Sequence, residues 1–220
     1  MPIFALPKSH LFPGIYLPLH VFEDRYKQML QYVEDNKTLL AVSYSPEFKP
    51  GQFFPSRVCG AGPVQIIKKF ESGESDILIL GTERVKFSKF TQEVPFLIGE
   101  CELLETDSDM PDSTRKDLVN DIRQTLISWF FTQMDDSERP IHFFKNVTDL
   151  ELLTHFVSNY FVNDPEQKQV ILEDNSLESR AQTVWQVLKD ITGPNPVNAS
   201  PSAEVLNFPG TDGKKKTPLN

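Results

Sequence analysis

The sequence predicts an α+β protein in which a β-sheet wraps around one helix and a group of helices follows. Short apolar runs separated by Gly, Pro, Ser and Asp dominate residues 3–104, and such runs are typical of strands. Beyond residue 112 the apolar residues recur at helical spacing instead. With 220 residues, 39% of them hydrophobic, the chain can bury a sizeable core.

Residues 11–30, LFPGIYLPLHVFEDRYKQML, change character at His20. Pro13 and Pro18 are compatible with a strand edge but not with a helix interior, because proline lacks a backbone N–H and clashes with the preceding turn. After His20 the apolar residues share one helical face, and acidic residues occupy the first turn, where the helix dipole favours them. We therefore expect an extended segment and then a single helix inserted between strands.

The second half is predicted to be helical. An acidic linker at residues 107–112 precedes a long amphipathic segment that starts near Ser113. Apolar residues also lie at helical spacing in residues 150–160 and 181–191, and Pro165 is well placed to open a short helix between those two segments. Four helices are expected after the linker.

These patterns divide the chain into three parts. Residues 1–106 form the predicted β-rich subdomain, and residues 107–193 form the predicted helical subdomain. Residues 194–220 contain mostly Pro, Asn, Ser, Gly and Lys, so they cannot bury enough apolar surface to offset the entropy cost of ordering. We expect them to be a flexible tail.

Charge and hydropathy exclude several classes of partner. The formal net charge of −9 repels phosphate backbones and anionic membranes, which argues against nucleic acid and membrane partners. No stretch reaches the roughly 18 apolar residues of a membrane span, and the N-terminus lacks a signal-peptide pattern. We therefore expect a cytoplasmic protein. Cys59 and Cys101 each lie in an apolar stretch with no second cysteine or histidine at metal-ligand spacing, so we expect buried, reduced thiols.

The stretch from 11 to 30 resembles the N-terminal signature of the LON substrate-binding domain family, which occurs in front of the ATPase of Lon proteases, in cereblon and in stand-alone bacterial proteins. The matching residues there are Phe12, Pro13, Gly14, Leu17, Pro18, Leu19, His20, Phe22, Glu23, Arg25, Tyr26 and Met29. Further matches are Gly60, Val64, Ile67, residues 77–81, Arg84, Val85, Lys168, Gln169, Leu172, Glu173 and Arg180. The resemblance thus covers about residues 1 to 190.

This resemblance implies a PUA-like β pseudo-barrel with one inserted helix, joined to an α-helical bundle. It also implies a non-enzymatic protein-recognition module that binds exposed hydrophobic or unfolded polypeptide segments, in association with proteolysis and protein quality control. The partners would be unfolded polypeptides, or a protease or chaperone that performs any work.

Motifs for catalysis are missing from the sequence. The nearest approach to a P-loop, at Gly210–Thr217, has the wrong glycine spacing and follows no predicted strand. There is no HExxH zinc motif and no GxSxG elbow. The acidic residues at 107–112 lack EF-hand spacing, and those at 135–138 lie in a polar interruption between predicted helices, so both clusters are interpreted as solvated surface. We predict that the protein is not an enzyme and uses no cofactor or metal.

Aromatic, histidine and arginine side chains near the predicted junction of sheet and helix are the candidate peptide-binding residues: Tyr16, His20, Phe22, Arg25, Phe53, Phe54 and Arg84. Adjacent residues such as Phe53 and Phe54 cannot share one face of a strand, so at least one is a candidate for exposure. The alternative is that this pair closes the end of the barrel.

The charged candidates also have structural alternatives. Guanidinium groups such as those of Arg25 and Arg84 can bind a peptide carboxylate through two donors, or can pair with Glu23 or Glu83 and fix the helix against the sheet. His20 can cap backbone groups at the helix entry or contact a ligand.

Two functional alternatives remain open at this point. One is an adaptor or structural protein that docks one specific folded partner, and the other is a hydrolase of unfamiliar type, which would require perturbed ionisable residues in a deep pocket. Dimerisation through the Phe-rich helices is also left open.

Overall fold

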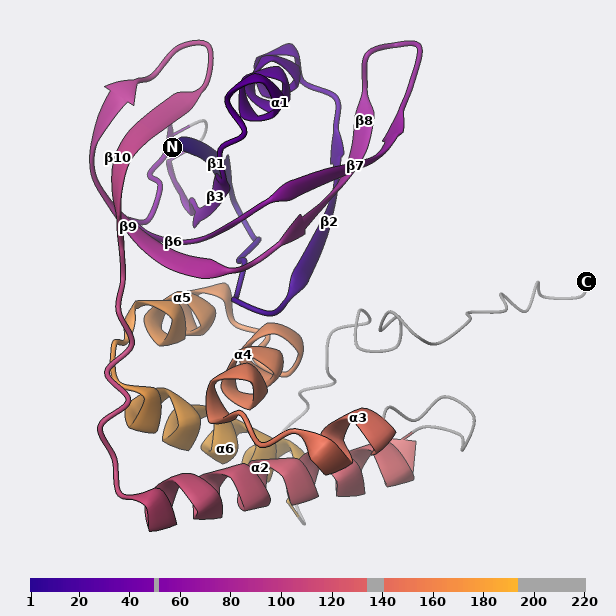
Figure 1. The fold of residues 1–220 in the computed structure, drawn as a ribbon, viewed down its shortest axis with the longest axis vertical. Coiled ribbons are helices and arrows are strands. Elements are labelled where there is room, and N and C mark those ends of the chain that lie inside the picture. Colours follow the sequence, from indigo (N-terminus) through magenta and orange to yellow (C-terminus); the bar gives the residue numbers. More distant parts are fainter. Residues whose placement is uncertain (50–51, 134–140, 194–220) are drawn as a thin grey trace, which may run out of the picture.

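The computed structural model describes residues 1–49, 52–133 and 141–193, with the backbone alone described at 47–49, 52–53 and 141–143. A β-barrel occupies one end of the molecule and a layer of helices occupies the other (Figure 1). A single extended connection after β10 leads from the barrel into the first helix of this layer.

Five strands close the barrel in the order β1-β10-β9-β6-β3. Their bounds are β1 Pro2–Leu6, β3 Leu40–Tyr44, β6 Val58–Gly62, β9 Glu83–Gln92 and β10 Leu97–Leu103. All neighbours are antiparallel except β1 and β3, which run parallel. A parallel pair needs a long crossover, and the chain supplies one through β2 (Tyr16–Val21) and α1 (Asp24–Asn36).

A second sheet of three strands leans against the barrel, in the order β2-β8-β7. Strand β7 spans Val64–Lys69 and β8 spans Ser75–Leu80; a short pair, β4 (Glu47–Lys49) and β5 (Gln52–Phe53), forms a separate ribbon. Helix α1 covers the inner face of the three-stranded sheet. The core between them contains Met29, Leu30 and Val33 from the helix and Ile77 and Ile79 from the sheet.

The helical layer consists of α2 (Asp112–Gln133), α3 (Ile141–Asn146), α4 (Leu150–Tyr160), α5 (Pro165–Glu173) and α6 (Leu177–Thr192). Three of these helices begin at side-chain caps, because Asp149, Asp164 and Ser176 accept hydrogen bonds from the first free N–H groups of α4, α5 and α6. One apolar cluster spans all five helices and reaches Phe12 and Val58 of the β-rich half.

The predicted α+β class is confirmed, with one helix inserted among strands and helices following. Four helices were expected after residue 107, and the described residues contain five, because the short α3 was not predicted. The division at residue 106 and the PUA-like designation stay predictions, and the predicted tail, 194–220, lies outside the described residues.

Two of the remaining expectations concern single features. Cys59 is buried and Cys101 half-buried, both as free thiols, and burial raises the pKa of Cys59 to about 12. Among the helices in the described ranges, none combines the length and the apolar character that crossing a membrane would require.

Candidate functional site

A groove of about 610 Å³ opens at one end of the barrel, beside the first turn of α1. We call it the aromatic groove. Its walls are Ile3, Ala5, Leu6, Pro7, Ser45, Pro55, Pro95 and Leu97 together with the aromatic residues Tyr26, Phe54, Phe90 and Phe96, and its charged residues are Glu23, Arg25 and Glu93. Segments far apart in the sequence therefore meet here, and most of what they contribute is apolar.

Contacts with two neighbouring side chains hold the ring of Tyr26 in place. The ring lies 4.3 Å from that of Phe4 in β1, and the guanidinium carbon of Arg25 lies 4.4 Å from the Tyr26 centroid. Burial raises the pKa of Tyr26 above its ordinary value, so the phenol stays neutral. The groove thus has a wall that is ordered by packing with β1.

Phe54 contributes the most exposed aromatic ring of the groove, with 60% of the residue accessible to solvent. It follows β5 directly, and Pro55 lies beside it in the groove wall. The side chain of Phe53, the other member of the predicted pair, lies outside the described part of the chain. Exposure of a large aromatic ring in a concave surface is typical of a binding site.

Arg25 pairs with Glu23, as one sequence-based interpretation expected, but both residues belong to the start of α1, so the pair does not join the helix to the sheet. The Arg25 Nε donates to Glu23 Oε2 at 2.8 Å, and the same side chain lines the groove. The pair lies at the surface, with both side chains well exposed. It therefore gives the apolar groove a hydrated, charged margin.

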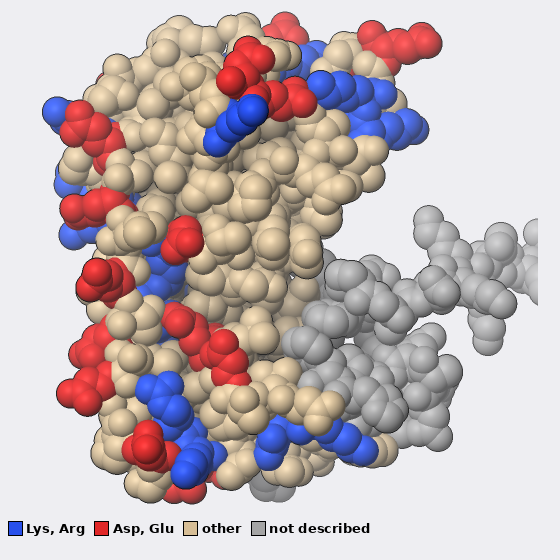
Figure 2. All heavy atoms as spheres, viewed as in Figure 1, with Lys and Arg blue, Asp and Glu red and all other residues tan. Residues whose placement is uncertain are grey.

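Tyr16, His20 and Phe22 lie elsewhere, on or beside the outer face of the three-stranded sheet. Tyr16 is 45% exposed and Phe22 59% exposed. His20 Nδ1 lies 2.7 Å from Asp76 Oδ1, and that hydrogen bond, chiefly, raises the pKa of His20. Figure 2 shows that this side of the barrel, around β2, carries few charged side chains, whereas such side chains gather along the β9–β10 side. These three residues thus belong to a second, flatter surface.

Arg84 occupies a third location, the junction of barrel and helices, where it is only 4% exposed. Its Nη1 donates to the carbonyl oxygens of Leu172 and Asp174 at 2.9 and 2.8 Å, and its Nη2 donates to Thr106 Oγ1 at 3.0 Å. The guanidinium thus has two backbone carbonyls and a hydroxyl as acceptors at the junction, which favours the structural interpretation of Arg84. We leave Arg84 out of the proposed binding surface.

Sequence reasoning missed three aromatic residues of the groove, Tyr26, Phe90 and Phe96. Tyr26 belongs to the apolar face predicted for the helix, but it is only partly buried and lines the groove. Phe90 and Phe96 flank the turn between β9 and β10. A pair of phenylalanines on either side of a proline-containing turn was the available signal, because such a turn lies at a barrel end.

In the described ranges, no three His, Cys, Asp or Glu side chains are grouped as metal ligands would be. The aromatic groove contains two carboxylates and one guanidinium, and two of these three groups pair with each other. Such a groove can bind apolar and aromatic side chains.

Comparison with known proteins gives a consistent result. The family model of the ATP-dependent protease La (LON) substrate-binding domain matches residues 1–190. The chain is 22% identical over 196 residues to the Lon protease of Cytophaga hutchinsonii, covering 87% of this chain and 24% of that protein. It is 21% identical over 193 residues to the Lon protease of Clostridium acetobutylicum, covering 86% and 25%. The chain thus spans about a quarter of the length of these curated relatives.

Solved structures share the fold. The N-terminal domain of a Mycobacterium avium complex Lon protease superimposes with a TM-score of 0.67 at 14% identity, covering 86% of this chain and 97% of that one. A Lon N-terminal domain protein from Xanthomonas campestris gives a TM-score of 0.59 at 17% identity, with 84% and 96% covered.

Proposed function

Because the chain belongs to the LON substrate-binding domain family, we propose that it is a non-enzymatic protein-recognition module that binds exposed hydrophobic or unfolded polypeptide segments. The aromatic groove is the proposed contact site, with Phe54 and Arg25 among its residues. Any hydrolysis or unfolding would be the work of a partner protease or chaperone. Nucleic acid and membranes are not among the proposed partners, given the net charge of −9.

One observation carries this proposal. Four aromatic side chains from separate segments converge on one concave surface, and Phe54 among them is largely exposed. Burying an exposed aromatic ring against a partner contributes about 1.5–3 kcal/mol of apolar transfer free energy. An unfolded chain offers apolar side chains that a folded protein hides, so the groove would discriminate by folding state.

The chemistry of the groove also explains why its preference for sequence would be weak. Specificity comes from buried polar groups that must find partners, and the charged groups of the groove lie at its hydrated margin. Apolar contact alone tolerates many side chains. A surface of this kind suits a protein that meets many clients with modest affinity.

The test is a titration of the purified protein into a fluorescently labelled, reduced and carboxymethylated polypeptide, beside the same polypeptide in its native, folded form. We expect binding of the unfolded form alone. Phe54→Ser and Phe90→Ser should each weaken it about tenfold, because each removes an aromatic contact worth about 1.5 kcal/mol. Val170→Ser on α5, also a large exposed apolar residue, is the matched control and should bind as the parent does.

Equal binding of folded and unfolded forms, or equal loss in the Val170 control, would refute the proposal. Absence of binding to the unfolded polypeptide at micromolar concentration would favour the alternative function, an adaptor that docks one folded partner. In that case a single saturable partner should be recovered, and the groove variants should lose it.

A further inference from the structure

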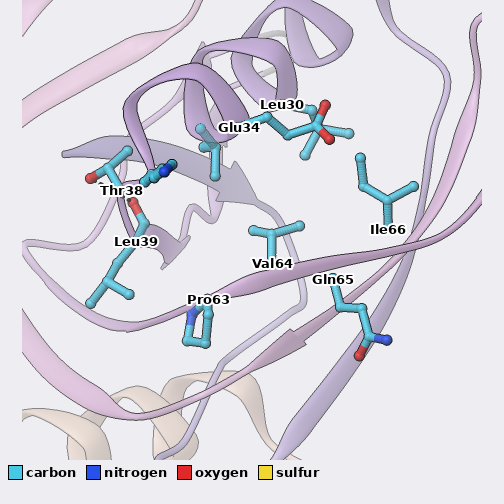
Figure 3. Close-up of a pocket in the computed structure, with 10 residues that line it drawn as sticks. Leu30, Glu34, Thr38, Leu39, Pro63, Val64, Gln65 and Ile66 are labelled. Atoms are coloured by element: carbon cyan, nitrogen blue, oxygen red, sulfur yellow. Dashed lines mark hydrogen bonds between the residues drawn. The ribbon is translucent and has the colours of Figure 1, made fainter.

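A hollow of about 520 Å³ lies between α1 and β7, and it shares no lining residue with the aromatic groove. Figure 3 shows Leu30 and Glu34 on the helix side and Val64 and Ile66 on the strand side, with Leu39 at one end. The lining is Leu30, Val33, Glu34, Lys37, Thr38, Leu39, Pro63, Val64, Gln65 and Ile66. Its walls are mainly aliphatic.

Strand β7 borders this hollow and is an edge of its sheet, since it pairs with β8 and, among the described residues, with no other strand. The Leu80 N–H donates to the Pro63 carbonyl at 3.2 Å, so Pro63 and Leu80 form a hydrogen-bonded pair. Hydrogen-bonded and non-bonded pairs alternate along an antiparallel ladder. The N–H and C=O groups of Val64 and Ile66 therefore face away from β8, toward the free edge.

The opposite edge of the same sheet, strand β2, is less able to pair with an added strand. There the Gly81 N–H donates to the Ile15 carbonyl at 2.9 Å, so alternation turns the backbone groups of Tyr16, Pro18 and His20 outward. Pro18 has no N–H to offer, and proline on an edge strand prevents pairing with another chain. On β7 the outward donors at Val64 and Ile66 are both present.

Side-chain directions match the same geometry. The Val64 and Ile66 side chains point toward α1, whereas Gln65 points away (Figure 3). A strand added beside β7 would alternate in the same way, so its inward side chains would enter the hollow. A register shift between Ile66 and Lys68 ends the regular ladder, which limits the added strand to a few residues.

Charge adds a preference at one end of the hollow. Glu34 is neutralised by Lys69, whose Nζ lies 3.0 Å from Glu34 Oε2. Lys37 also lines the hollow and forms no ion pair with any carboxylate in the described ranges. An occupant with an acidic residue near Lys37 would therefore be favoured over one with a basic residue there.

We propose that the free edge of β7 binds one short extended segment of another polypeptide as an added strand, with alternate apolar residues in the hollow and an acidic residue beside Lys37. Main-chain hydrogen bonds give affinity without sequence preference in this mode of recognition. The inference rests on the proposed function and deepens it, because it names the conformation and the charge of the segment recognised.

The first test follows amide hydrogen exchange by NMR. Each of two probe peptides contains six residues in which Val and Thr alternate. One probe has an Asp added at each end, and the other has a Lys added at each end. On addition of the Asp-flanked peptide we expect the Val64 and Ile66 amides to become protected, and we expect it to bind several-fold more tightly than the Lys-flanked peptide. The Lys37→Glu variant should reverse that preference.

The second test removes single main-chain hydrogen bonds. The Asp-flanked peptide is prepared in two versions, N-methylated at its odd or at its even residues, and the protein is left unchanged. The version whose methyl groups replace the N–H groups that face β7 should lose binding, and the other version should keep it. Val64→Pro removes an N–H that faces the free edge and should weaken binding about tenfold. Gln65→Ala changes only a side chain that points away from α1 and should leave binding unchanged. If the Val64 variant fails to fold, the N-methylated peptides still decide.

The outcomes distinguish binding at the β7 edge from binding in the aromatic groove. Binding of the unfolded polypeptide without protection at Val64 and Ile66 overturns the inference and leaves the proposed function standing. If these amides are already protected in the free protein, the inference is also overturned. Protection that is independent of protein concentration would mean that a segment of the same chain covers the edge, and protection that rises with concentration would mean that a second copy does. Protection by the peptide that persists in Phe54→Ser supports it, and absence of binding by every probe overturns both proposals.

Discussion

Arg180 Nη2 donates to Glu151 Oε1 at 2.9 Å, joining α6 to α4 through a guanidinium that is almost fully buried. Thr106 Oγ1 donates to the same oxygen at 2.7 Å and accepts from both Arg180 and Arg84. Burial alone would raise the pKa of Glu151, but the hydrogen bonds from Thr106 and Arg180 lower it below its usual value. The network thus links the barrel strand β9, the connection after β10 and two helices.

Removing one member of this network should be costly. Arg180→Met leaves Glu151 and His155 without their charged partner, and we expect the free energy of unfolding to fall by about 3–5 kcal/mol. Urea unfolding followed by circular dichroism measures this loss. Arg25→Met is the control, because its pairing with Glu23 is exposed and should contribute only about 0–1 kcal/mol. Equal losses in the two variants would show that burial of the pair does not matter.

Arg84→Lys tests the structural role assigned to Arg84. A single ammonium cannot reach Leu172, Asp174 and Thr106 together, so we expect a loss of about 2–4 kcal/mol in stability. Binding of the unfolded polypeptide by the folded variant should stay unchanged. A large loss of binding with little loss of stability would return Arg84 to the peptide-binding residues.

Two buried histidines predict a dependence of stability on pH. Burial, with the nearby charge of Arg180, lowers the pKa of His155 to about 3; burial, with Lys168, lowers that of His10 to about 4. Between about pH 6.5 and pH 4 the unfolded chain binds these protons and the native protein does not. Each histidine should therefore lower stability by about 1.4 kcal/mol per pH unit as the pH falls through this window.

Urea unfolding at several pH values between 4 and 7 measures that slope. The unfolded chain of His10→Leu binds one proton fewer than the unfolded parent chain. The slope of stability against pH should therefore decrease by about 1.4 kcal/mol per pH unit. His20, which is exposed and has a raised pKa, provides the contrast, since its protonated form is the one stabilised by Asp76. An unchanged slope in His10→Leu would mean that His10 is already protonated in the native protein.

Gly60→Ala should be among the most damaging single changes in the barrel. A Cβ at Gly60 would lie 1.7 Å from the Leu11 carbonyl oxygen, which belongs to the backbone and cannot move alone. We expect a loss of more than about 4 kcal/mol in thermal or urea unfolding. Gly73→Ala is the control: Gly73 has a positive φ of 83°, but the nearest atom to an added Cβ is Lys27 Cδ at 3.8 Å, an ordinary contact, so the change should cost about 1–2 kcal/mol. Comparable losses of stability in the two variants would mean that the contact with the Leu11 carbonyl is not what makes Gly60→Ala costly.

Local pattern was sufficient for much of the fold. The prolines at 13 and 18 and the apolar stripe that follows predicted an extended segment and then a helix, and the structure contains β2 and α1 there. Helical spacing likewise predicted α2, α4 and α6, and Pro165 predicted α5. These elements are predictable because their periodicity is a property of consecutive residues.

The binding residues were only partly accessible to the same reasoning. Tyr16, His20 and Phe22 were selected together with Arg25 and Phe54, yet they lie on a different surface. Arg84 could not be distinguished from an exposed arginine, because its partners are backbone carbonyls 88 and 90 residues away. Spacing along the chain carries no information about contacts of that range.

The sequence by itself determined the class of the fold, the order of most of its elements and the family, since hydrophobic period, proline positions and a short signature are local features. Only the tertiary structure decided which side chains share a surface. Closing the barrel brings Phe90 and Phe96 beside Tyr26 and Phe54, and pairing β7 with β8 turns the donors of Val64 and Ile66 outward. Both depend on strand order and register, which arise from long-range packing of the whole chain.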